Sequence, residues 1–154
     1  MHNLEHCKPA DEPSMAKNSR VIADAGAIVG LIRPRDQWHE WAINTANQLA
    51  PPFYTCDVVI AEACFLVRDL WPAQQRILRM LSDGFLRLEF SLADEVENIH
   101  ELMRKYADLP MSVADACLVR MSELHDDAAV FTVDQDFLIY RKHGRKKIPL
   151  ISPF

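Results

Sequence analysis

Four acidic residues of this 154-residue chain lie within or next to apolar sequence. Asp24 is the one polar residue in the run VIADAGAIVGLI. Glu62 interrupts the stretch IAEACFLV, Asp115 lies in SVADACLV, and Asp134 follows a short apolar stretch in FTVDQDF. A carboxylate among apolar residues is costly when it is buried without a partner, so a role for the charge is expected at these positions.

Carboxylate oxygens are the ligands that hard divalent cations prefer, which favours Mg²⁺ or Mn²⁺ over zinc or copper. Clustered carboxylates without a cation repel one another and take up protons. A bound cation can hold phosphate oxygens and lower the pKa of a water molecule. The chemistry that such a cluster suits is phosphodiester hydrolysis, and the sequence holds no GxSxG motif that would indicate a serine nucleophile instead.

The elements that must position these acids are strands that alternate with helices. Strands are predicted at 20–23, 53–55, 86–90, 129–133 and 148–151. Helices are predicted at 25–32, 36–49, 58–70 (with Asp57 as its N-cap), 73–81, 93–106 and 113–125. This alternation predicts an α/β fold with a parallel sheet and helices on its faces.

Because crossovers in a parallel sheet share one hand, the four acids are expected at the carboxyl edge of the sheet. Ligands of open α/β sheets bind outside that edge. Structural alternatives stay open for single residues. Asp24 could cap the helix that follows it, Asp115 forms a capping box with Ser112, and Asp134 and Asp136 are typical turn residues.

In these motifs the chain resembles the PIN-domain nucleases, which include the VapC-type toxins of toxin–antitoxin pairs. The resemblance covers roughly residues 21–149 and rests on all four motifs in order. It implies a PIN-like three-layer sandwich, in which a short parallel β-sheet is flanked by helices. It also implies that Asp24, Glu62, Asp115 and Asp134 (the four acids) form the catalytic metal site, with Asp108, Thr132 and Asp136 as its outer-shell candidates.

The function implied by the resemblance is hydrolysis of RNA by an endoribonuclease that uses Mg²⁺ or Mn²⁺. RNA is the expected substrate, and an antitoxin protein and a second copy of the chain are open hypotheses for partners. The alternative is a PIN fold that serves as a non-catalytic interaction module. An aspartyl-nucleophile phosphatase is disfavoured because it would need a second Asp at position 26, which is glycine.

The composition is that of a globular protein, with 49% hydrophobic residues and a net charge of −5. A negative chain has no general attraction for nucleic acid, so RNA binding would need a local patch. The stretch YRKHGRKK is such a patch, or else a solvated loop. Its candidate RNA contacts are Arg141, Lys142, Arg145, Lys146 and Lys147.

Three further features complete the expectations from sequence. The tryptophans Trp38, Trp41 and Trp71 could stack on bases, although helical spacing is more typical of a core or a dimer surface. Residues 1–19 read as a disordered tail, and residues 20–154 as a single domain. No signal peptide or membrane-spanning run is visible and three cysteines lie in apolar segments, which favours a cytoplasmic protein with reduced thiols.

Overall fold

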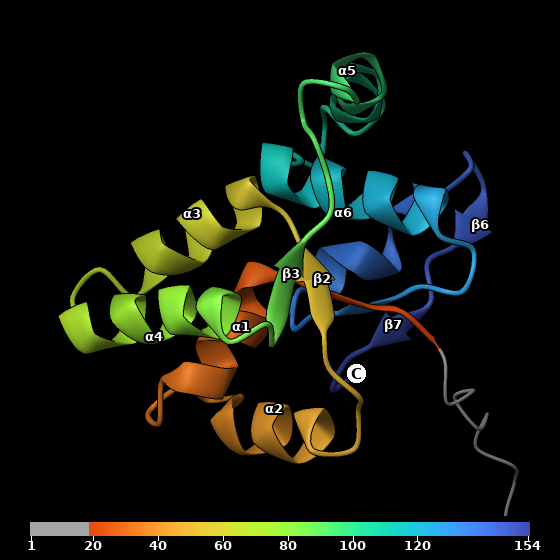
Figure 1. The fold of residues 1–154 in the computed structure, drawn as a ribbon. Helices are drawn as coiled ribbons and strands as arrows, with labels where there is room; N and C mark the ends of the chain where they lie inside the picture. Colours follow the sequence, from red (N-terminus) through yellow and green to blue (C-terminus); the bar gives the residue numbers. More distant parts are fainter. Residues whose placement is uncertain (1–18) are drawn as a thin grey trace, which may run out of the picture.

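A computed structural model describes residues 19–154, so the expectation of a disordered tail lies almost wholly outside the described residues. Five short parallel strands form the central sheet in the order β3-β2-β1-β4-β7 (Figure 1). Their bounds are β1 Val21–Ala23, β2 Phe53–Thr55, β3 Leu86–Leu88, β4 Ala129–Phe131 and β7 Leu150–Ile151. The predicted parallel α/β sheet is therefore confirmed.

Six helices flank the sheet (Figure 1). They are α1 Ala25–Ile32, α2 His39–Ala46, α3 Asp57–Leu66, α4 Trp71–Ser82, α5 Val96–Lys105 and α6 Val113–Leu124. Helix α1 packs against α2, α3 and α4, while α6 packs against α3, α5 and the central strands. No helix in the described part of the chain is both long and apolar enough to cross a membrane.

The centre of the sheet explains why the acids at its edge can share a site. Strand β1 lies between β2 and β4, and all its residues are buried. Ala23 at the end of β1 pairs with Phe131 at the end of β4. The residues that follow these two strands therefore leave the sheet side by side, at its carboxyl edge.

Several helix boundaries differ from the prediction. Helix α2 begins at His39 rather than at residue 36, because the Asp36 carboxylate accepts the backbone N–H of Trp38 at 2.8 Å and forms a turn there. Asp57 is the first residue of α3 and not its cap, a position that Cys56 occupies. The same helix ends at Leu66, where a turn replaces the expected last part up to residue 70.

The basic stretch is neither a helix nor an irregular loop. It folds into a two-stranded antiparallel hairpin of β5 (Arg141–Lys142) and β6 (Lys146–Lys147). The turn between the strands places His143 and Gly144 at positive φ, 51° and 82°. Gly144 suits this left-handed conformation because it carries no Cβ.

Candidate functional site

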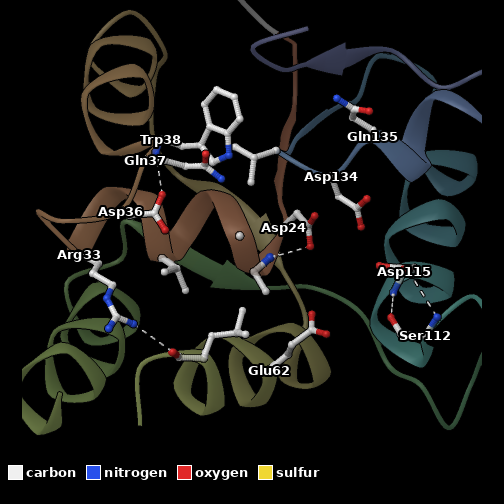
Figure 2. A pocket seen from close by; sticks show the side chains of 15 residues that line it. Asp24, Arg33, Asp36, Gln37, Trp38, Glu62, Ser112, Asp115, Asp134 and Gln135 are labelled. Atoms are coloured by element: carbon white, nitrogen blue, oxygen red, sulfur yellow. Dashed lines mark hydrogen bonds between the residues drawn. The ribbon is translucent and has the colours of Figure 1, made fainter. Parts of the chain in front are cut away.

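A pocket of about 660 Å³ opens at the carboxyl ends of β1 and β4, and all four acids line it (Figure 2). Asp24 lies between β1 and α1, and Asp134 follows β4. Glu62 comes from α3, and Asp115 comes from the first turn of α6. The structure thus brings the four acids to one pocket, while their part in binding a metal stays a prediction.

Asp24 lies at the bottom of the pocket and is 4% exposed. One carboxylate oxygen accepts the backbone N–H of Ala25 at 2.7 Å, and the other accepts the hydroxyl of Thr132 at 2.7 Å. Burial raises the pKa of Asp24 from 3.8 to about 7, the hydrogen bond from Thr132 opposes this rise, and the negative charge of Asp115 adds to it. Asp24 is therefore both the cap of α1 and a carboxylate poised near neutral pH.

Asp115 combines a capping role with a place in the pocket. Its backbone N–H donates to the Ser112 hydroxyl at 3.0 Å, and its carboxylate accepts the Ser112 N–H at 3.4 Å, which completes the capping box. The same carboxylate accepts the hydroxyl of Tyr140 at 3.0 Å. Burial raises the pKa of Asp115, the hydrogen bond from Tyr140 opposes this, and the charge of Asp134 raises it further.

Glu62 and Asp134 complete the acidic side of the pocket. Burial raises the pKa of the half-buried Glu62, and the charges of Asp115 and Asp134 raise it further. The Asp134 carboxylate accepts the backbone N–H of Asp136 at 2.9 Å and so caps the short 3₁₀ helix Gln135–Leu138. The turn role expected for Asp134 therefore coexists with its place in the pocket.

Gly26 explains how closely the two strand ends approach. A Cβ at this position would lie 2.8 Å from a methyl group of Val133. Real Cβ atoms do not come this close, so with a larger residue either the Val133 side chain or the start of α1 would have to shift. The glycine that disfavoured a phosphatase thus has a structural role between Asp24 and Asp134.

The same architecture occurs in a solved structure. VapC20 of Mycobacterium tuberculosis, described as a toxin that cleaves the sarcin–ricin loop, matches with a TM-score of 0.69 and 18% sequence identity. The match covers 75% of this chain and 91% of VapC20. The chain has a PIN-like fold. No protein-family model matches the chain, and no curated protein matches it in sequence.

Three residues are expected in the outer shell of the metal site, and the structure places them in different surroundings. Thr132 is buried and joins two of the acids, because its hydroxyl donates to Asp24 and accepts the backbone N–H of Asp134 at 3.0 Å. Asp136 is half-buried next to Asp134 but is not among the residues that line the pocket. Asp108 is exposed in the turn after α5 and is not among the residues that line the pocket.

Tyr140 donates a hydrogen bond to one of the four acids and was not predicted from the sequence. It is fully buried, and its ring packs edge-on against Tyr106 and Phe137. A buried tyrosine usually has a hydrogen-bond partner for its hydroxyl, but the sequence does not show that Tyr140 is buried. The partner itself, Asp115, lies 25 residues earlier and becomes visible only in the fold.

The oxygen donors of the pocket fit a hard divalent cation. Three of the four acids have a pKa raised in part by the charges of the others, and a cation among them would relieve this repulsion. Within residues 19–154, no three His, Cys, Asp or Glu side chains already lie together as a set of metal ligands. The four acids would therefore have to draw closer together around an ion.

The candidate RNA contacts on the hairpin need a correction. Lys142 is buried and its amino group donates to the backbone oxygen of Ser122 at 3.2 Å, so it is not available to RNA. Arg141 is half-buried, and one nitrogen of its guanidinium, Nη1, donates to the three backbone oxygens that precede it. The cations that remain exposed, here called the hairpin cations, are Arg145, Lys146 and Lys147.

The hairpin also lies away from the four acids. Its hydrogen bonds with α6 are at Ser122 and Glu123, seven and eight residues beyond Asp115, which corresponds to about 10 Å along a helix. Figure 1 shows β6 beside the end of α6 that is distant from α3. Any RNA contact of the hairpin cations would therefore involve a part of the substrate remote from the pocket.

Proposed function

We propose that this protein is an endoribonuclease that hydrolyses RNA phosphodiester bonds with Mg²⁺ or Mn²⁺ held by the four acids. The observation that carries the proposal is their convergence on one pocket at the carboxyl edge of a PIN-like sheet. The pKa values of Asp24, Glu62 and Asp115, each raised by burial and by neighbouring charges, add electrostatic support, because such a group of carboxylates gains most from a divalent cation.

In this proposal Asp24, Asp115 and Asp134 would hold the cation directly, and Glu62 would complete the site, position the attacking water and accept its proton. Burial and the charges of Asp115 and Asp134 raise the pKa of Glu62, which makes it a stronger base for this step. Thr132 fixes the orientation of the Asp24 carboxylate. The bound metal supplies a Lewis acid that neutralises charge on the phosphate.

The test is incubation of the purified protein with a mixed RNA pool in Mg²⁺, in Mn²⁺ and in EDTA, followed by mapping of the new ends. The proposal expects cleavage with either metal, none in EDTA, and a loss of at least 100-fold in Glu62→Gln, in line with a lost general base. RNA binding without cleavage in any metal would instead identify the non-catalytic interaction module.

The similarity to VapC20 motivates a second proposal, that the chain is the toxin of a toxin–antitoxin pair. Its partner would be an antitoxin protein that blocks the pocket. Growth arrest on induced expression, and its relief by co-expression of a small DNA-binding protein encoded next to the gene, would support this role. Arrest that persists in Asp24→Asn would contradict it, because the arrest would then not depend on the pocket.

A further inference from the structure

The pocket that holds the four acids extends beyond them onto the segment that joins α1 to α2. Its second half is lined by Arg33, Asp36, Gln37 and Trp38 (Figure 2). A volume of about 660 Å³ lies within the range of about 300–1,000 Å³ that is usual for sites of organic ligands. The pocket therefore has room for more than a metal ion and one phosphate group.

The backbone of this segment is held in place. The Asp36 carboxylate accepts the N–H of Trp38, and the Asp36 carbonyl accepts the N–H of His39 at 3.0 Å. Gly30 lets α1 approach α2, because a Cβ there would lie 3.2 Å from the Cβ of Ala42. The position of Trp38 at the rim is thus fixed by its own turn and by the contact between two helices.

Arg33 is also held, with its guanidinium part-exposed at the pocket. It forms an ion pair with Asp69 at 2.7 Å and donates to the backbone oxygen of Leu66 at 3.3 Å. Figure 2 shows Arg33 on the side of the pocket opposite Asp115 and Asp134. The charge of Arg33 is thus balanced by Asp69, and Asp36 adds a carboxylate at the same end of the pocket.

The three tryptophans have different surroundings, which separates their roles. Trp41 packs against Phe131 with ring centroids 5.4 Å apart, as a core residue does. Trp71 is 68% exposed on α4 and is absent from the pocket lining. Trp38 alone among them lines the pocket. The indole of Trp38 and the amide of Gln37 in one cavity match the face and the edge of a nucleotide base.

We propose that Trp38 is a stacking platform for an unpaired base next to the scissile phosphate. The inference rests on the proposed ribonuclease function and assigns one residue of the pocket to base binding. A base can stack on Trp38 only when it is released from a duplex, so the pocket selects single strands and loops over paired RNA.

The first experiment measures binding without cleavage, in a Glu62→Gln background with Mg²⁺. The probe is a fluorescently labelled 12-nucleotide single-stranded RNA of mixed sequence, and the same RNA annealed to its complement. Trp38→Leu is expected to weaken single-strand binding about 5- to 100-fold, and Trp38→Phe is expected to retain most of the affinity. Trp71→Leu is the matched control and should leave binding unchanged.

The second experiment reads the stacking contact directly. In a Trp41→Phe/Trp71→Phe variant, Trp38 is the remaining tryptophan, and the single-stranded RNA should quench its fluorescence while the duplex should not. Absence of quenching, or equal losses of affinity in Trp38→Leu and Trp71→Leu, overturns the inference. Cleavage that fails while the quenching persists overturns the proposed ribonuclease and leaves the stacking site in place.

Discussion

Replacing Asp24 with Asn is expected to stabilise the metal-free protein, although it removes a carboxylate that caps a helix. Burial raises the pKa of Asp24 from 3.8 to about 7 in the folded state. Between these pH values the folded protein holds a proton that the unfolded chain releases, so its stability falls as the pH rises through this window. Above pH 7 the ionised Asp24 costs up to about 4 kcal/mol, at about 1.36 kcal/mol per pH unit.

Asparagine removes this cost and loses part of the hydrogen bonding. Its side-chain oxygen can still accept the N–H of Ala25, whereas the 2.7 Å hydrogen bond from the Thr132 hydroxyl is lost or reversed. That loss costs about 1–2 kcal/mol. The net expectation is a gain of about 1–3 kcal/mol in the free energy of unfolding at pH 8. At pH 4, close to the unfolded pKa of 3.8, Asp24 is protonated in the folded state and about half ionised in the unfolded chain, so most of the electrostatic cost is absent and the gain should disappear.

The assay is urea unfolding in EDTA at pH 4 and pH 8, followed by circular dichroism, for the wild type and Asp24→Asn. Asp108→Asn is the control, since Asp108 is exposed and lies outside the pocket, and it should change stability little at either pH. A gain of equal size at both pH values would refute the electrostatic reasoning. So would a marked loss of stability at pH 8, which would show that capping by Asp24 dominates.

Three further outcomes are expected. Tyr140→Phe deletes the hydroxyl that orients Asp115, so it should weaken Mn²⁺ binding and cleavage about 10-fold or more while the fold is retained. An unchanged Mn²⁺ affinity in calorimetric titration would contradict this. Gly26→Ala should lower the free energy of unfolding by about 1–3 kcal/mol, because the new Cβ clashes with Val133. A second substitution, Val133→Ala, should restore much of the loss. Melting curves without this rescue would count against the contact. Replacing the hairpin cations with Gln should lower RNA affinity for all sequences and leave turnover unchanged. The slope of log affinity against log salt concentration should become shallower by up to about 2. An unaltered slope would mean that these cations do not contact RNA.

The strands and helices that carry the site were predictable from sequence. The bounds of α1 and β2 agree with the prediction to the residue, because Pro34 follows the end of α1 closely and Pro51 and Pro52 precede β2. The parallel order of strands then places Asp24 and Asp134 at one edge, since each follows the end of a neighbouring strand. Periodicity and chain direction are local properties, which is why they can be read without a structure.

The features that the sequence did not reveal depend on contacts between distant segments. Lys142 reads as one more exposed cation, yet it is buried because its amino group reaches a backbone oxygen of α6. Tyr140 reads as part of a basic stretch, yet its hydroxyl holds Asp115. The rim position of Trp38 likewise depends on a turn formed by Asp36 and on the packing of α1 against α2. Spacing along the chain carries no signal for such contacts.

The most direct measurement of the central claim, a divalent cation held by the four acids, is anomalous diffraction from crystals of the protein soaked in Mn²⁺. The expected result is a strong peak in the pocket, with carboxylate oxygens of Asp24, Asp115 and Asp134 at about 2.1 Å, and its loss in Asp134→Asn crystals. Crystals in which Mn²⁺ binds elsewhere, or in which the pocket peak persists in the variant, would contradict the claim.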